Sequence, residues 1–555
     1  MTHTKIILVF VGLFVFHSTA IWGQSERAAR YEPGDWITYG NFHYITGFAK
    51  GDNQFFIGTT HGVLRYDQLS REWKYPYTAG SGLSDSYVLN VQYVDSNQKL
   101  WVFTRGGVDV ISLVTNRWEH IENTEHILRS DVRRVTVRNS GQDVYVVNGA
   151  NRVYRINKFT HYVREIENLP SNIGSDTQAI PNPLPLYNLN GPWIIDRNTN
   201  RLEDDNFREY PFTSMVRDSR QQTWLGTWGA GFIRADATSK VGRVWRIGPI
   251  SNAVGAMYKD GEQFWFGGAQ SRYSGPPSIE GEPGISYWDM DRDEWHHWRQ
   301  NEEYRINDAT IYNIDGDEHS VWFGTERGLL HYSKEKSRWM NISNSSLGSH
   351  QVYEVLVQDT SVWVASRSGL YRVSNPTGGF TENISILKER MIGVYALARI
   401  NNILYAGTDN GLVELDLATM EMKYYDRNGN YVPAEKFSEF RVYAIAAGKN
   451  NVYYANDFGL FELNLVSKSV QELPKIGIYA RSIPRKIEVG PGGVWVAFDD
   501  GLGQYNPENR EWEYFTREDG LASNLVYDIV PENEYIWIAT HQGVTRFNPS
   551  NLNLR

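Results

Sequence analysis

One motif recurs along nearly the whole chain of 555 residues, and it constrains the fold more than any other feature. Each copy has an alternating segment around an aromatic residue, a short polar turn with Gly, and a second alternating segment, as in VWFGTERGLLHYS and LYAGTDNGLVELD. The aromatic positions of the C-terminal half, separated by 41, 42, 48, 42 and 42 residues, are Trp322, Trp363, Tyr405, Tyr453, Trp495 and Trp537. A repeat of this length is typical of the four-stranded blades of a β-propeller, so the sequence predicts an all-β propeller.

Alternation of apolar and polar residues assigns four strands to each repeat. In a late repeat the strands are RKIEVG, VWVAF, LGQYN and EWEYF. A Gly after the second strand, as at Gly62, Gly328, Gly411 and Gly543, is expected to supply the positive φ of a tight turn. The Trp residues of the fourth strands are expected to pack between neighbouring blades; they are Trp73, Trp118, Trp295, Trp339 and Trp512.

The number of repeats sets the expected domain organisation. Further aromatic markers lie at Phe56, Trp101, Tyr145, Trp224 and Trp265, and a degenerate copy around Trp193 brings the total to about twelve blades. Twelve blades in one ring would leave a wide, poorly packed channel, so we expect two rings of six or seven blades. Regular spacing fails in the Pro-rich stretch from Ser171 to Pro211, so the expected groups of blades are residues 24–215 and 216–555.

The two ends of the repeat region are complementary. The sequence stops after a third strand, GVTRFNP, so the last repeat lacks its fourth strand. The segment GDWITYG around Trp36 is similar to the fourth strands EWEYF and RWEHI. We therefore expect the strand at residues 35–39 to pair with the last blade, which would remove an open sheet edge.

The N-terminus indicates export. Lys5 precedes an apolar run from Ile6 to Phe16, and small residues at Ser18, Ala20 and Gly23 offer cleavage sites. This pattern predicts a signal peptide over residues 1–23, with an uncleaved anchor as the alternative. No later segment has 18 continuous apolar residues, so we expect no membrane span in the mature chain and a location in the periplasm or at the cell surface.

Composition excludes several classes of function. The chain has no Cys, which excludes disulfides, thiolate metal sites and Cys nucleophiles. Its net charge is −10 and no basic stripe follows the repeat, so nucleic acid is not an expected partner.

The string DGLASNLVYDIV followed by IWIATHQGVTRFNP resembles the two-component-regulator propeller repeat, and SGLSDSYVLNVQYV with LWVFTRGGVDVIS repeats it. The resemblance covers nearly all of the mature chain and is weakest between about 150 and 220. It implies a periplasmic sensor propeller, of a kind that often recognises glycans, or a propeller of the type IX secretion attachment machinery. The chain ends at its last blade, so the resemblance implies a separate kinase or secretion partner.

Motifs for catalysis are missing from the sequence. It has no HExxH, no Walker-type loop and no GxSxG elbow, and GTWGAG at Gly226 is in register with the other blade turns. The string WDMDRDEW places Asp289, Asp291 and Asp293 at calcium-loop spacing but without the Gly and Glu of such loops. His296 and His297 are expected to point to opposite faces of a strand, so we expect no metal and no cofactor. A glycosidase or lyase carboxylate pair assembled across blades stays open as an alternative.

The candidate binding residues lie in the turns between second and third strands. One of these turns is long, from Ala269 to Pro283, and carries Arg272 and Tyr273, while the preceding blade's turn offers Trp228. Aromatic side chains can stack on sugars, and an Arg guanidinium can make two hydrogen bonds to an acidic group, so these residues are suited to bind either ligand. Other turns contribute His61, Arg105, Arg327, Arg367 and His541, and the alternative reading of the long turn is a surface insertion with no role.

These features together predict a non-enzymatic, exported propeller that binds a carbohydrate or a protein in the cell envelope. The ligand-binding residues of this prediction are Trp228, Arg272, Tyr273, Arg327 and Arg367. The alternatives are a structural or assembly component of an envelope secretion system, and a propeller glycosidase or lyase.

Overall fold

We describe the fold from a computed structural model, which places residues 31 to 550 with internal gaps. The positions outside the described residues are 1–30, 32–33, 129–132, 171–179, 219, 270–283, 300–305, 307–309, 343–350, 376, 378–379, 385–391, 427–428, 438–439, 476–481, 483 and 551–555.

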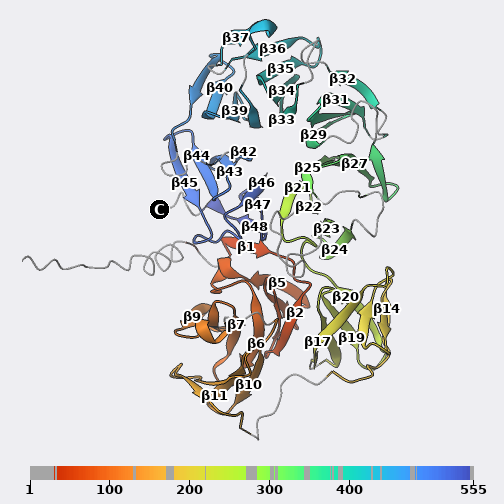
Figure 1. The fold of residues 1–555 in the computed structure, drawn as a ribbon, viewed down its shortest axis with the longest axis vertical. Coiled ribbons are helices and arrows are strands. Elements are labelled where there is room, and N and C mark those ends of the chain that lie inside the picture. The colour runs from red at the N-terminus through yellow and green to blue at the C-terminus, as the bar shows by residue number, and fades with distance from the viewer. Residues whose placement is uncertain are drawn as a thin grey trace, which may run out of the picture.

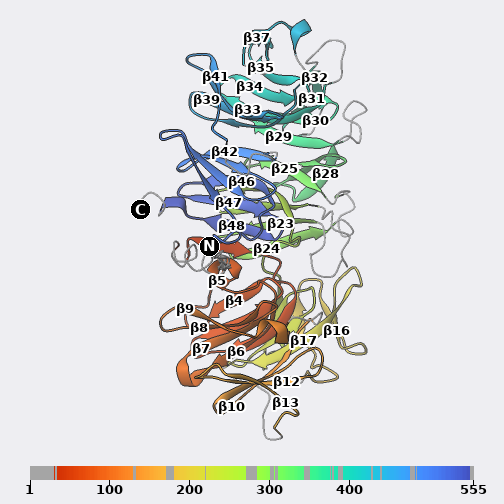
Figure 2. The same cartoon turned by 60° about the vertical axis from the view of Figure 1, so that its left-hand side comes forward.

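The described residues form eleven β-sheets, of which nine have four strands, one has five and one has seven. Figure 1 shows them in two groups: β2 to β20, in orange to yellow, and β1 with β21 to β48, mostly green to blue. We call these the N-terminal group and the C-terminal group. The turned view in Figure 2 shows the same two groups one above the other.

The N-terminal group begins with three regular four-stranded sheets. Their strands are β2 (Ile45–Lys50), β3 (Gln54–Thr59), β4 (Gly62–Asp67) and β5 (Glu72–Tyr77); β6 (Val88–Val94), β7 (Lys99–Thr104), β8 (Gly107–Ser112) and β9 (Arg117–Ile121); and β10 (Thr136–Ser140), β11 (Asp143–Val147), β12 (Val153–Asn157) and β13 (Val163–Ile166). Short helices η1 (Ala79–Ser81) and α2 (Glu125–Leu128) lie between these sheets, and η2 (Asp95–Asn97) lies between β6 and β7.

The fourth sheet of this group is irregular. Its strands are β14 (Asn188–Asn190), β15 (Ile194–Asp196), β16 (Arg201–Glu203), β17 (Glu209–Arg217), β18 (Gln222–Thr227), β19 (Phe232–Asp236) and β20 (Val241–Trp245). The degenerate repeat expected around Trp193 is therefore not a separate sheet, because β15 and β16 extend the sheet that contains Trp224 through the long strand β17.

The C-terminal group contains seven sheets. Their strands are β21 (Val254–Asp260), β22 (Gln263–Gly268), β23 (Gly284–Asp289) and β24 (Glu294–Arg299); β25 (Ile311–Gly316), β26 (Ser320–Thr325), β27 (Gly328–Ser333) and β28 (Arg338–Ile342); β29 (Val352–Gln358), β30 (Ser361–Ser366), β31 (Gly369–Ser374) and β32 (Phe380–Ile384); β33 (Val394–Ile400), β34 (Ile403–Thr408), β35 (Gly411–Asp416), β36 (Met422–Tyr425) and β37 (Tyr431–Val432); β38 (Val442–Ala447), β39 (Asn451–Asn456), β40 (Gly459–Asn464) and β41 (Ser469–Glu472); β42 (Lys486–Gly490), β43 (Gly493–Ala497), β44 (Leu502–Asn506) and β45 (Glu511–Phe515); and β46 (Val526–Glu532), β47 (Tyr535–Thr540) and β48 (Gly543–Phe547) with β1 (Trp36–Tyr39). A short helix, η3 (Ala434–Lys436), follows β37.

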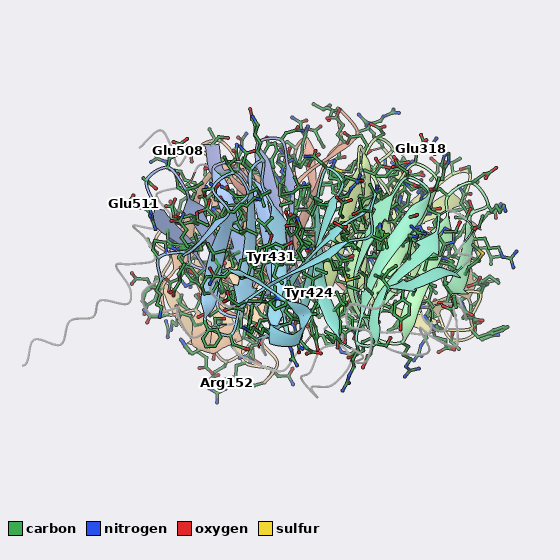
Figure 3. All side chains as sticks on the ribbon, turned by 90° about the horizontal axis from the view of Figure 1, so that it is seen from above. Arg152, Glu318, Tyr424, Tyr431, Glu508 and Glu511 are labelled. Carbon is green, nitrogen blue, oxygen red and sulfur yellow. The ribbon has the colours of Figure 1, made fainter. Side chains whose placement is uncertain are left out.

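The first strands of the seven sheets follow one another around the group. Contacts run in the order β21, β25, β29, β33, β38, β42 and β46, and β46 contacts β21 again. The turns after first strands and after third strands lie at the same end of the sheets: Glu318, between β25 and β26, and Glu508, between β44 and β45, lie along the same edge of the molecule in Figure 3. The first strands therefore surround the centre of the C-terminal group.

The last sheet is completed by the N-terminal strand, as the sequence predicted. β1 pairs antiparallel with β48, with Trp36 opposite Phe547, and their rings stack with centroids 3.8 Å apart. Trp36 is buried against Phe515 of the neighbouring sheet as well. The pairing leaves β48 without an open edge.

The chain passes between the groups twice. It starts in the C-terminal group with β1, enters the N-terminal group at β2, and returns between β20 and β21. The boundary expected at 215/216 falls inside β17, whose sheet packs on β2: Trp224 is in one buried cluster with Phe55 and Ile57. The boundary between the groups instead lies between Trp245 and Val254.

The interior is built from the predicted periodicity. Fully buried Trp residues stand on second strands of six sheets: Trp101, Trp224, Trp265, Trp322, Trp495 and Trp537. The four glycines expected to need a positive φ have φ values of 129°, 128°, 139° and 114° at Gly62, Gly328, Gly411 and Gly543. Each buried Trp side chain stabilises the fold because it removes roughly 150–250 Å² of surface from water.

Among the described residues, the helices are all too short, or too polar, to cross a membrane.

Candidate functional site

A cavity of about 520 Å³ opens at the centre of the C-terminal group, and we call it the mouth cavity. Five tyrosines from five first strands line it, and we call them the tyrosine ring: Tyr312, Tyr353, Tyr395, Tyr443 and Tyr527. The other two sheets contribute Arg485, immediately before β42, and Gly255 of β21.

A β-bulge explains why these side chains face the cavity. In each of the five strands the register shifts around the tyrosine, as between Val352 and Glu354 on either side of Tyr353. A bulge leaves one residue unpaired and re-aims its side chain. In the first strands of the N-terminal group the described bulge residues are Thr46, Leu89 and Thr213, so the tyrosine ring belongs to the C-terminal group.

Three tyrosines of the ring contact a residue fourteen positions later, in the turn between the second and third strands. Tyr395 donates to Asp409 at 2.9 Å, Tyr443 donates to Asp457, and Tyr527 lies 3.3 Å from Nδ1 of His541. Arg485 contacts Asp499 in the same way. The spacing is the same in these four sheets because the start of the first strand and the turn after the second strand lie at the same end of the sheet.

The tyrosines also pack on one another. The ring centroids of Tyr312 and Tyr353 are 5.8 Å apart, and those of Tyr353 and Tyr395 are 4.9 Å apart. Gln351 joins the first pair, because it accepts from the Tyr353 hydroxyl at 2.8 Å and donates to the Tyr312 oxygen at 3.5 Å. These contacts hold three neighbouring blades' side chains in a continuous arc.

Burial and hydrogen bonds to carboxylates keep two hydroxyls of the tyrosine ring protonated. Burial, and then the hydrogen bond to Asp409, raise the pKa of Tyr395 to about 12. Burial and Asp457 raise the pKa of Tyr443 to about 12 in the same way. Both hydroxyls therefore keep their protons at neutral pH and donate them to the turn carboxylates.

A second cavity of about 350 Å³ lies along the first strands, and we call it the inner cavity. Lys486 of β42 crosses to Glu354 of β29 at 2.7 Å, although these strands are not neighbours, and it lies 3.4 Å from Glu488. Burial alone would lower the pKa of Lys486, but Glu354 and Glu488 hold it well above its usual value. Burial raises the pKa of Glu488 to about 7.

Only part of the site predicted from the sequence lies near the mouth cavity. Arg327 and Arg367 are exposed in the turns after β26 and β30; Glu326, next to Arg327, lines the mouth cavity, and the charge of Arg367 acts on Tyr353. Arg272 and Tyr273 lie outside the described residues. Of the other turn residues considered, His541 lines the cavity.

Trp228 lies in the N-terminal group, away from the mouth cavity. Its ring meets Tyr44 edge-on at 5.2 Å, and the Arg133 guanidinium lies 4.9 Å above it. It packs against a buried cluster that includes Leu89 of β6 and Tyr87, which directly precedes β6. Arg105 stacks over Tyr87 at 3.7 Å in the same group. Trp228 thus joins sheets within the N-terminal group and does not share a site with Arg327 and Arg367.

The acidic string and the His pair have local roles. Asp289 accepts from the Arg292 backbone at 3.0 Å in the β23–β24 turn, and Asp293 accepts from Trp288. His297 is buried and His296 is exposed, as the strand periodicity predicted. Within the described residues no cluster of three His, Asp or Glu side chains is arranged to hold a metal ion.

The sequence analysis missed the tyrosine ring, although its signal is visible in the sequence. A β-branched residue followed by Tyr opens five first strands: IYN, VYE, VYA, VYA and VYD. Period-two alternation assigns such a Tyr to one face of a strand, and only the bulge turns it toward the cavity.

Sheets of this kind and number define an all-β protein of propeller-like architecture. No protein-family model matches the chain, and no curated protein matches it. A solved structure with the same fold is that of PorZ, described as an essential bacterial surface component of the type-IX secretion system of Porphyromonas gingivalis. The TM-score is 0.56 at 12% identity, and the match covers 93% of this chain and 87% of that one. At this identity the likeness shows the fold alone.

Two extracellular domains from B. thetaiotaomicron are more distant. That of the system BT3049 has a TM-score of 0.43 at 13% identity, covering 94% of this chain and 77% of that one. That of BT4673 has a TM-score of 0.42 at 13% identity, covering 91% and 70%. We draw no argument from scores at this level.

Proposed function

We propose that the chain is an exported, non-enzymatic propeller module of the cell envelope that binds a carbohydrate or protein partner at the mouth cavity. The observation that carries this proposal is the tyrosine ring, which lines a cavity of about 520 Å³ at equivalent positions of five sheets. Ligand sites usually have volumes of about 300–1,000 Å³ and aromatic walls with a few placed polar groups.

The proposal includes a specific architecture. The C-terminal group is a seven-bladed ring closed by β1, and the N-terminal group is a smaller second ring. The succession of first-strand contacts from β21 to β46 and back to β21 supports the closed ring. In such a ring the bulge residues converge on one end of the central channel, where propellers commonly bind.

The pairing of the charged groups supports binding over hydrolysis. Arg441 makes two contacts to Asp409, at 2.9 and 3.0 Å, and Arg485 contacts Asp499. A glycosidase pair needs one carboxylate that donates a proton and one that attacks or activates water. At the mouth, Asp409 and Asp499 are instead held by arginines, so the glycosidase or lyase alternative has less support.

Site-specific photo-crosslinking tests the proposal. We expect benzoylphenylalanine at position 353 to capture an envelope partner, protein or glycan, that the same residue at position 159 does not capture. Phe159 is exposed on an outer hairpin of the N-terminal group and serves as the matched control. Equal products from both positions, or no product from position 353 in envelope preparations, would contradict binding at the mouth.

The likeness to PorZ favours a second candidate, a component of an envelope secretion machinery. It rests on a shared fold over 93% of the chain. Deleting the gene should then leave secreted surface proteins inside the cell. Normal surface display in the deletion strain would dismiss this candidate without affecting the first.

A further inference from the structure

The direction of the hydrogen bonds in the tyrosine ring determines what the ring can offer a ligand. A hydroxyl has one proton, and an ionised carboxylate can only accept. Asp409 already accepts from the Gly393 backbone at 3.0 Å and from Arg441, so it must receive the Tyr395 proton as well. The proton of Tyr395 therefore points at the turn and not into the cavity.

The two neighbouring blades repeat this arrangement. Tyr443 donates to Asp457, and Tyr353 donates to Oε1 of Gln351 at 2.8 Å. The high pKa values of Tyr395 and Tyr443, near 12, agree with hydroxyls held as donors to carboxylates. Three adjacent sheets, those of β29, β33 and β38, thus present phenol oxygens whose protons are already used. What remains on each oxygen is a lone pair.

We propose that the tyrosine ring is a receptor for a primary ammonium group, carried by a lysine side chain or by the N-terminal amine of a protein partner. This inference rests on the proposed function and names the chemistry of the partner. An ammonium has three donors and no acceptor, so it matches the phenol oxygens of Tyr353, Tyr395 and Tyr443, which can only accept. Phenol faces and nearby carboxylates favour the same charge.

The arginines at the mouth do not reverse this preference. Arg441 is engaged with Asp409, and its guanidinium lies 4.8 Å above the Tyr395 ring. Arg485 is engaged with Asp499 and lies 5.5 Å from the Tyr527 ring. The charges of Arg441 and Arg485 are each balanced by a turn carboxylate. Glu326 and Asp457 add two carboxylates at the same end of the sheets, where Arg327 and Arg367 are exposed in the turns after β26 and β30. Anionic ligands would meet oxygens with no proton to donate.

Titration of the full mature chain with small amides, followed by NMR at neutral pH, tests the inference. The compounds are Nα-acetyl-lysine methylamide, with a side-chain ammonium; glycine methylamide, with only an α-ammonium; and Nα-acetyl-norleucine methylamide, a neutral analogue of lysine that lacks the amine nitrogen. We expect at least one ammonium compound to bind tenfold or more tightly than norleucine. The stronger of the two identifies the source, a lysine side chain or a chain terminus.

Tyr395→Phe and Tyr443→Phe remove the oxygens but keep the rings, so each should weaken ammonium binding at least fivefold. Tyr162→Phe, at an exposed position of the N-terminal group, is the matched control and should leave binding unchanged. Thermal melting shows whether a variant is folded. Equal binding of the norleucine compound, no binding of either amine, or unchanged binding by the two variants overturns the inference.

These outcomes are separable from failure of the proposed function. If position 353 captures a partner while the amines bind no better than norleucine, the mouth is a binding site for another chemistry. If position 353 captures nothing, the proposed function itself fails.

Discussion

At the scale of single residues, a bulge near the start of most first strands decides which side chain lines the mouth cavity. The bulge turns Tyr353 and its four counterparts toward the mouth cavity, while the next residue, such as Glu354, faces the inner cavity. In the N-terminal group the same position holds Thr46, Leu89 or Thr213. The lining of the mouth cavity therefore depends on which side chains stand at this bulge position, which recurs in most first strands.

A second residue-scale feature is a histidine between two carboxylates. Nδ1 of His120 lies 2.7 Å from Asp109 and Nε2 lies 3.1 Å from Glu125. The hydrogen bond to Asp109 is the main cause that raises the pKa of His120 to about 9. The charged imidazolium thus joins β8 and β9 to the start of α2.

We expect this histidine to make stability depend on pH in the alkaline range. Its pKa is higher in the folded than in the unfolded chain, where it is about 6.5, so its contribution is complete below about pH 6.5 and is lost as pH rises through about 9. Urea unfolding at pH 6 and pH 10 checks this. His120→Gln should be destabilising at pH 6 and nearly neutral at pH 10; an equal effect at both values would contradict the assignment.

At the scale of strands and sheets, polar side chains of the first strands join neighbouring sheets. Asn313 accepts from the Val355 backbone at 3.0 Å, and Glu354 accepts from Leu397 at 2.6 Å. Asp528 of β46 accepts from Met257 of β21 at 2.7 Å. The last of these bonds lies where the end of the C-terminal group meets its beginning.

Removing the Asp528 carboxylate should weaken the contact between the last and the first sheet of the C-terminal group. Asp528→Ala leaves the buried Met257 N–H without its partner, so we expect a loss of about 1–3 kcal/mol. Asp528→Asn keeps an acceptor and should cost less. Denaturant unfolding measures both, and hydrogen exchange at Met257 should increase in the Ala variant alone.

The pairing of β1 with β48 is the other contact that completes the last sheet. Trp36→Ala removes a buried ring that stacks on Phe547, so we expect a loss of about 3–5 kcal/mol. Phe159→Ala, at a side chain that is 65% exposed, should change stability by less than about 0.5 kcal/mol. Thermal or chemical unfolding checks the pair, and similar losses for both would refute a special role of β1.

At the scale of the whole molecule, two chain segments connect the groups and bond to each other. The side-chain amide of Asn41 donates to the Ile250 carbonyl at 2.6 Å, and its carbonyl oxygen accepts from the His43 backbone at 3.0 Å. The backbone of Asn41 donates to Asn252 at 3.3 Å. The path out of the C-terminal group thus lies against the path back into it (Figure 1).

If the hydrogen bonds between the two connecting segments are lost, the two groups should unfold more independently of each other. Asn41→Ala leaves the buried Ile250 carbonyl without this bond, at a cost of about 1–3 kcal/mol. We expect limited proteolysis to cut between residues 246 and 253 faster than in the parent chain. Asn198→Ala, in an exposed turn, is the matched control. Unchanged cleavage would show that Asn41 does not hold the junction.

The repeat made much of the fold predictable, because strand alternation and Gly turns are local properties. The pairing of Trp36 with the last sheet and the positive φ of Gly328 both follow from such local patterns. The boundary between the two groups could not be predicted from local patterns. The strand β17 continues across residues 215 and 216, and its packing on β2 is a long-range contact. Of the candidate site residues, Arg327 and Arg367 lie in turns near the mouth cavity and Trp228 lies in the N-terminal group; their role in binding stays a prediction.

The sequence by itself determined an all-β repeat architecture and complementary ends, since periodicity and turn residues act over a few neighbours. Only the tertiary structure decided which repeated position faces a cavity. A bulge changes the direction of one side chain, and the convergence of Tyr353, Tyr395 and Tyr443 depends on how separate sheets are arranged around a centre. Contacts between residues far apart in the chain carry that arrangement, and no local pattern encodes them.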